Sequence, residues 1–183
     1  MAIKTFTTGE VLTASDTNTY LANAGLVYVT STTIGTAVSS VTVSNCFTAT
    51  YDTYRIVVSG QGSASNNENG ILTLNGGTTE YYGGLIYGLA GGTAPLLAAH
   101  NNTANFPYAF YSSIVSGVVA TIEIHNPYVA DYTMVQSTYW NTGGFGTFTG
   151  VRGANTQHTG FTLAPTTGTF TGNTITVYGY RKA

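Results

Sequence analysis

The stretch that decides the fold class of this chain is residues 106–125, FPYAFYSSIVSGVVATIEIH. Its second half has the two-residue period of a strand with one buried face, because apolar residues at 118, 120, 122 and 124 alternate with Thr121, Glu123 and His125. Its first half alternates in the same way, with Phe106, Tyr108, Phe110 and Ile114 on one face and Ala109, Tyr111 and Val115 on the other. Ser116-Gly117 supplies a two-residue turn, so the stretch predicts a β-hairpin.

Outward from this stretch, short β-rich runs recur at close spacing in both directions. The clearest runs are residues 26–29, 38–43, 51–60, 71–74, 80–89, 132–140 and 174–181. Residues 91–105 look irregular, and Pro95 argues against a central strand there. The pattern predicts a mainly β protein, an antiparallel and jelly-roll-like β-sandwich preceded by a short N-terminal helical arm. We expect the arm at residues 1–30 and the sandwich body at residues 31–183.

The arm contains a helix signal of about ten residues. Thr13 can cap the first turn, Asp16 three residues later completes a capping box, and Gly25 offers a left-handed end. A helix this short is marginal in water, so Leu12, Tyr20 and Leu21 must pack on another surface. That surface is either the body of this chain or a different protein.

The composition indicates a folded chain with an uncharged surface. Charged residues are only 7% of the 183 residues, whereas hydrophobic residues reach 43% and aromatic residues 13%. The exposed faces must then consist largely of Thr, Ser, Asn, Gly and Tyr, which favours a subunit of an assembly or a robust extracellular domain. A net charge of −2 gives no basic footprint for nucleic acid.

The same sequence argues against export and membrane insertion. We find no signal-peptide pattern and no apolar run long enough to cross a bilayer, so we expect synthesis in a cytoplasm and no insertion into a membrane. The single Cys46 excludes an internal disulfide.

Few side chains suggest catalysis or metal binding. Among His100, His125 and His158, only His125 has a close ligand-type neighbour, Glu123, and two such groups do not make a zinc site. No serine lies on a nucleophile elbow, and no acid, base and nucleophile set emerges. We therefore expect a protein that is not an enzyme and that has no catalytic residues, no metal site and no cofactor.

Aromatic residues offer a candidate ligand or receptor surface, because Tyr and Trp rings stack on the apolar faces of sugars and anchor interfaces. The candidates are Tyr81, Tyr82, Tyr108, Tyr111 and Trp140. The alternative is that most of these rings belong to the core or to a subunit interface. The adjacent Tyr139 and Trp140 must point to opposite faces of their strand, so at most one of them serves a given surface.

Both ends of the chain resemble one protein family. Residues 6–21, FTTGEVLTASDTNTYL, look like the N-terminal segment of many tailed-bacteriophage virion proteins. The β-rich body of such tail-fibre and minor-tail-like proteins resembles residues 47–57, 160–163, 167–172 and 175–181. The resemblance implies a non-enzymatic virion component whose N-terminus docks onto the particle. The expected docking residues are Phe6, Val11, Leu12, Thr13, Asp16, Tyr20 and Leu21.

Three functions follow as hypotheses. The first is a tail-associated fibre or receptor-binding subunit, a homotrimer located in the virion, with other virion proteins of the tail, baseplate or capsid as partners and a host-surface glycan as a candidate ligand. The second is a capsid decoration or cement protein. The third is a carbohydrate-binding module.

Overall fold

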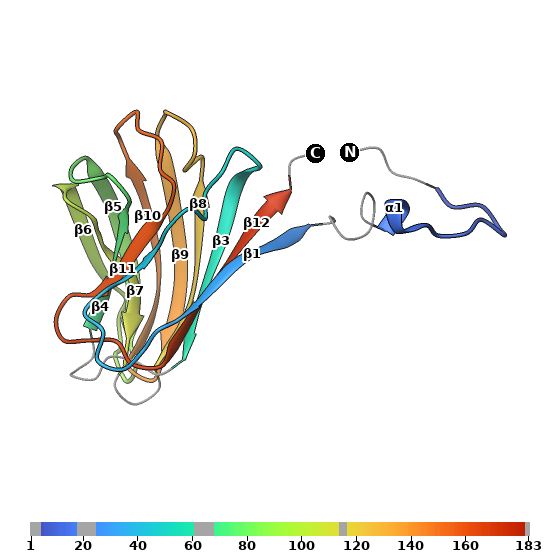
Figure 1. Ribbon diagram of the computed structural model, residues 1–183. Coiled ribbons are helices and arrows are strands. Elements are labelled where there is room, and N and C mark those ends of the chain that lie inside the picture. Colours follow the sequence, from blue (N-terminus) through green and yellow to red (C-terminus); the bar gives the residue numbers. More distant parts are fainter. Residues whose placement is uncertain (1–4, 18–24, 61–67, 114–116, 182–183) are drawn as a thin grey trace.

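The computed structural model describes residues 5–17, 25–60, 68–113 and 117–181, and it is mainly β with two antiparallel sheets in a sandwich (Figure 1). The predicted fold class is confirmed in these features. The strands of the described residues are β1 (Leu26–Thr33), β2 (Val41–Val43), β3 (Tyr51–Gly60), β4 (Glu68–Leu74), β5 (Tyr81–Leu89), β6 (Leu96–Thr103), β7 (Phe106–Ser112), β8 (Val118–His125), β9 (Thr133–Asn141), β10 (Gly144–Arg152), β11 (Phe161–Pro165) and β12 (Asn173–Arg181).

The two sheets differ in size. The larger sheet has eight strands in the order β1-β12-β3-β8-β9-β10-β5-β6, and the smaller sheet has four in the order β2-β11-β4-β7. The larger sheet curves around the smaller one (Figure 1). Strands β8 and β9 alternate between buried and solvent-facing residues along almost their whole length, so one face of the larger sheet lies on the core and the other faces solvent.

The predicted hairpin at residues 106–125 is wrong as a pairing, although both of its strands exist. Strand β7 pairs with β4 in the smaller sheet, whereas β8 pairs with β3 and β9 in the larger sheet. Among the described residues, an isolated bridge joins Ser113 and Gly117 of the two segments, through N–O distances of 3.1 and 3.0 Å. A two-residue period indicates only that one face of a strand is buried. Two strands that pair in one sheet and two strands that face each other across a core both have this period, so it does not predict the pairing. Ile114, Val115 and Ser116 lie outside the described residues.

Aromatic rings fill the space between the sheets. Phe47 lies 5.8 Å from Phe161, and Phe110 lies 5.8 Å from Phe170, measured between ring centroids. All four rings are at most 1% exposed. The burial of these rings and their favourable geometry stabilise the fold, which has no internal disulfide because the chain has a single cysteine.

Three strands, β6, β10 and β11, are not among the runs predicted from the sequence. Strand β6 lies within the region expected to be irregular, but it is an edge strand and begins directly after Pro95, so the argument against a central strand holds. Strand β10 contains residues 146–150, GTFTG, and the same five letters occur again at residues 168–172, between β11 and β12. The two copies thus have different structures, and they share a buried phenylalanine, Phe148 or Phe170.

The arm begins as the sequence predicts. Helix α1 (Ala14–Asp16) has Thr13 as its N-cap: the Thr13 hydroxyl accepts a bond from the Asp16 amide at 3.1 Å, and the Asp16 carboxylate accepts one from the Thr13 amide at 3.1 Å. The rest of the predicted helix segment, with Tyr20 and Leu21, lies outside the described residues. Strand β1 crosses residue 30, where the arm was divided from the body, and that division stays a prediction.

Candidate functional site

The N-terminal arm presents apolar side chains to solvent. Val11 is 77% exposed, Leu12 is 50% exposed and Phe6 is 38% exposed. Residues 5–15 are all exposed, so this part of the arm is not packed on the sandwich, and Figure 1 shows it beyond the end of β1.

Two tight turns with the same chemistry hold the arm in shape. In the first, the Thr7 amide donates to the Glu10 carboxylate at 3.1 Å, and the Glu10 amide donates to the Thr7 carbonyl at 3.0 Å. Gly9 has a φ of 89°, which a glycine adopts without strain. The capping box of Thr13 and Asp16 is the second turn, so Val11 and Leu12 project from between two locally hydrogen-bonded turns.

The predicted aromatic surface is divided among three places, the first of which is the core. Tyr81 is fully buried, and its hydroxyl accepts from the Leu74 amide at 3.0 Å. The guanidinium of Arg152 lies 5.6 Å from the centre of its ring. Tyr81 therefore does not belong to a ligand surface, because its side chain points inward from β5 and binds the backbone of β4.

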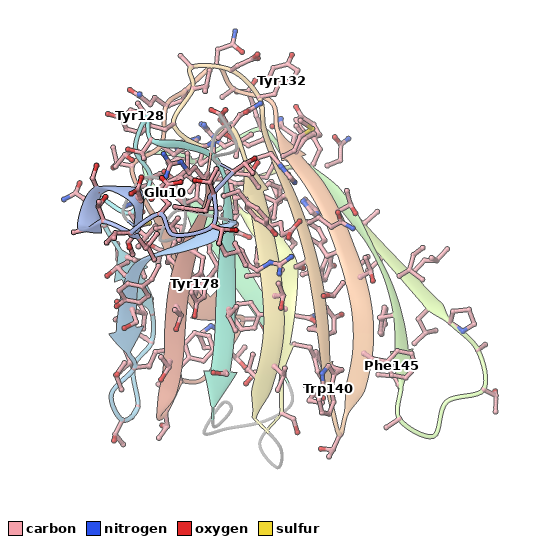
Figure 2. All side chains as sticks on the ribbon, turned by 90° about the vertical axis from the view of Figure 1, so that its right-hand side faces the viewer. Glu10, Tyr128, Tyr132, Trp140, Phe145 and Tyr178 are labelled. Atoms are coloured by element: carbon pink, nitrogen blue, oxygen red, sulfur yellow. The ribbon has the colours of Figure 1, made fainter. Side chains whose placement is uncertain are left out.

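The second place is the outer face of the larger sheet. Trp140, 64% exposed, stands beside Val119 of β8 and Phe145 of β10 in the cross-strand register, and Figure 2 shows Trp140 and Phe145 at one end of this face. Phe145 lies over Gly88 of β5, where a β-carbon would come within 2.7 Å of its ring. Tyr82 is half-buried and pairs with Val151 toward the other end of β5. The end with Trp140 thus carries a row of exposed apolar side chains.

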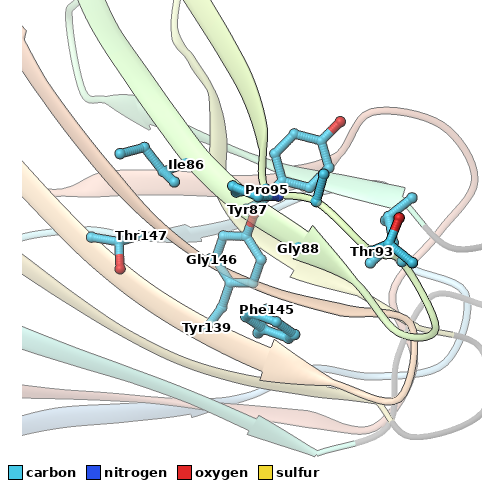
Figure 3. A pocket seen from close by; sticks show the side chains of 12 residues that line it. Ile86, Tyr87, Gly88, Thr93, Pro95, Tyr139, Phe145, Gly146 and Thr147 are labelled. Carbon is cyan, nitrogen blue, oxygen red and sulfur yellow. The ribbon is translucent and has the colours of Figure 1, made fainter.

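A cavity of about 660 Å³ opens beside this row (Figure 3). Phe145 and Tyr139 lie on one side of it, and Tyr87 and Pro95 on the other. Gly146 makes room for the Tyr139 side chain, since a β-carbon there would lie 2.7 Å from the tyrosine hydroxyl. No charged residue lines the cavity among the described residues, so it suits an apolar or neutral group.

The third place is a smaller cavity of about 250 Å³ between the two sheets, which we name the tyrosine slot. The residues that line it are Glu68, Asn69, Leu85, Tyr87, Leu89, Ala98, Tyr108 and Tyr111. It adjoins the larger cavity, because Tyr87 and Leu89 line both. The predicted Tyr108 and Tyr111 thus meet here, whereas Tyr82 and Trp140 do not join them.

The charge in the slot is fixed by Glu68. Its carboxylate accepts hydrogen bonds from the hydroxyls of Thr166 at 2.6 Å and Thr167 at 2.7 Å, which lower the pKa of Glu68. Burial, and then the charge of Glu68 and the neighbouring Tyr87, raise the pKa of Tyr111. Near neutral pH the slot therefore holds an ionised carboxylate beside the neutral hydroxyl of Tyr111, with no Lys or Arg among its described lining residues.

Sequence reasoning did not place Glu68 at an aromatic site, and it did not predict that Tyr87 lies beside Tyr108 and Tyr111. Glu68 follows a polar loop and is one carboxylate of seven, so its position carries no distinguishing local signal. Tyr87 belongs to β5 of the larger sheet, and only the packing of that strand against β7 brings it to Tyr108 and Tyr111.

Glu123 and His125, which were considered as metal ligands, contact side chains of neighbouring strands. Glu123 forms an ion pair with Arg55 and accepts a hydrogen bond from the Tyr180 hydroxyl. The Nδ1 atom of His125 lies 3.1 Å from the Thr53 hydroxyl. In the described ranges no three His, Cys, Asp or Glu side chains gather into a metal-binding group, and no helix is long and apolar enough to cross a membrane.

Comparison of the chain with protein-family models, with curated proteins and with solved structures found no match.

Proposed function

We propose that this chain is a non-enzymatic structural protein of a tailed-bacteriophage virion, a tail-associated fibre or receptor-binding subunit that docks onto the particle through residues 6–21. The observation that carries the proposal is the exposure of Val11 and Leu12, 77% and 50%, on an arm shaped by its own hydrogen bonds. An ordered turn with exposed apolar side chains loses little conformational entropy on binding, so it suits an anchor in a partner's pocket.

The body supports a place in an assembly. Its outer face carries the exposed Val119, Trp140 and Phe145 in one row, and aromatic residues with few charges are typical of interface centres. This surface suits a subunit interface, so we propose that the chain forms a homotrimer. Its other partners would be virion proteins, and its location the virion.

The docking proposal is tested with virions assembled in the presence of variant chains. The double variant Val11→Ser and Leu12→Ser should be lost from particles, because burial of two such side chains contributes about 3–6 kcal/mol, which corresponds to a loss of at least ~100-fold in affinity. The matched control is Leu97→Ser, since Leu97 is 78% exposed on the body. Normal incorporation of the arm variant, or equal loss of the control, would refute docking through the arm.

Cryo-electron microscopy of the same virions locates the arm directly. Density for residues 6–17 in contact with another virion protein is the expected result, and an arm free in solvent contradicts it. Binding of the purified protein to host cells then separates a receptor-binding subunit from a capsid decoration protein, which should show no such binding.

A further inference from the structure

We propose that the tyrosine slot binds one neutral hexopyranose ring, the recognition unit of a host-surface glycan. The proposal deepens the receptor-binding part of the proposed function and rests on it, but it concerns the body and not the arm. It is carried by the volume of the slot, by the strands that supply its rings and by the position of Glu68.

The volume of the slot sets the size of the ligand. Cavities that bind drug-sized molecules measure about 300–1,000 Å³, and the slot, at about 250 Å³, lies just below this range. A single sugar ring is therefore a better match than a peptide segment. The larger cavity adjoins the slot at Tyr87 and Leu89, which leaves space for the next residue of a glycan chain.

The rings of the slot come from both sheets. Tyr87 belongs to β5, whereas Tyr108 and Tyr111 belong to β7, so a ligand between them meets aromatic surface from two sides. Tyr111 is held by a stack with Tyr139, with centroids 6.3 Å apart and planes 23° apart, and Tyr108 is backed by His100 at 6.0 Å. Rings that are already positioned lose little entropy on binding, and tyrosine offers an apolar face together with a hydroxyl.

Glu68 supplies the polar recognition. The hydroxyls of Thr166 and Thr167 orient its carboxylate but occupy only part of its accepting capacity, because two carboxylate oxygens offer about four acceptor sites. The remaining sites can accept bonds from sugar hydroxyls, and such charge-assisted bonds are about twice as strong as neutral ones. The same negative charge repels uronic and sialic acids, which restricts the ligand to neutral sugars.

The test is saturation-transfer NMR on the full chain with glucose, galactose, mannose and N-acetylglucosamine, with glucuronic acid and choline as probes of charge. We expect transfer to at least one neutral sugar, with a Kd of about 1 mM, and none to glucuronic acid. Glu68→Gln should weaken binding about tenfold or more, because it replaces a charged acceptor. Tyr108→Ala should abolish binding, and Trp140→Ala on the outer face is the matched control.

Any one of four results would overturn the sugar site. The first is the absence of transfer to every neutral sugar at tens of millimolar, and the second is unchanged binding in both Glu68→Gln and Tyr108→Ala. The third is loss of binding in Trp140→Ala, and the fourth is a preference for choline, which would assign the slot to a cation. Tyr111→Phe, which keeps the ring, and a circular dichroism spectrum of each variant separate lost recognition from lost folding. The arm variant Val11→Ser and Leu12→Ser should bind sugar normally, so failure of the slot and failure of docking are distinguishable.

Discussion

Replacement of Gly70 by alanine should destabilise the sandwich, because the core leaves no space for a β-carbon at this position. Gly70 is buried in β4 and pairs with Phe110 of β7 on one side and with Pro165 of β11 on the other. A β-carbon would lie 2.2 Å from two atoms of the Phe110 ring. That ring is fully buried and packs on Phe170 at 5.8 Å, so it has no direction in which to move freely.

The magnitude follows from two opposing effects. Overpacking of a dense core costs about 1–3 kcal/mol, and an overlap this severe belongs to the upper part, about 2–3 kcal/mol. Alanine also restricts the unfolded chain, which returns about 0.4–1 kcal/mol. The free energy of unfolding should therefore fall by about 1–2.5 kcal/mol, and Tm should fall by about 2–10 °C for a chain of this length.

The assay is thermal and urea unfolding followed by far-ultraviolet circular dichroism. Gly35→Ala is the matched control, because Gly35 is exposed and its β-carbon would meet only Val38, at an ordinary 3.6 Å. The control should keep or raise Tm, since only the effect on the unfolded chain remains. If Gly70→Ala unfolds at the wild-type temperature or above it, the Phe110 ring does not lie against Gly70 in solution.

Acid should destabilise the fold, because two histidines have lowered pKa values. Burial, and then the guanidinium of Arg152, whose Nη1 atom lies 2.8 Å from Nε2 of His158, lower the pKa of His158. Burial lowers the pKa of His100. In the unfolded chain these histidines bind protons near the ordinary pKa of about 6.5. Their contribution to the free energy of unfolding is therefore fully present above that pH and is lost as the pH falls toward the lowered values. Between pH 8 and pH 5, the measured Tm should drop less in His158→Gln than in wild type. Burial raises the pKa of the Cys46 thiol to about 12, and the residue is 1% exposed, so a thiol reagent should modify it only in denaturant; rapid reaction of the native protein would contradict this burial. Ser137→Ala removes a 2.6 Å hydrogen bond from β9 to a backbone carbonyl of β7, and the free energy of unfolding should fall by about 0.5–1.5 kcal/mol in urea titrations, whereas an unchanged midpoint would show that the bond contributes nothing.

Local features of the chain were predictable because they depend on neighbouring residues. Strand β8 has the inward and outward faces that its alternation indicates, with Ile122 buried and Thr121 only half-buried. Thr13 and Asp16 form the expected capping box, since both partners lie within four residues.

Residues that depend on distant partners were not predictable. Strand β10 is rich in glycine and has a weak strand signal, yet it lies inside the larger sheet between β9 and β5. The Tyr139 side chain occupies the space where a β-carbon of Gly146 would lie, so this glycine is required by a distant residue. In the same way, no pattern near residues 106–125 says whether β7 and β8 pair or face each other across the core.

The sequence by itself therefore determined the fold class, the strand faces and the capping box of the arm, because hydrophobic period and capping are short-range properties. Only the tertiary structure decided which sheet each strand joins and where each aromatic ring lies, with Tyr81 in the core, Trp140 on the outer face and Tyr108 in the tyrosine slot. The reason is physical: these assignments follow from the packing of rings from strands far apart in the chain, and the free energy of that packing has no counterpart in any local stretch.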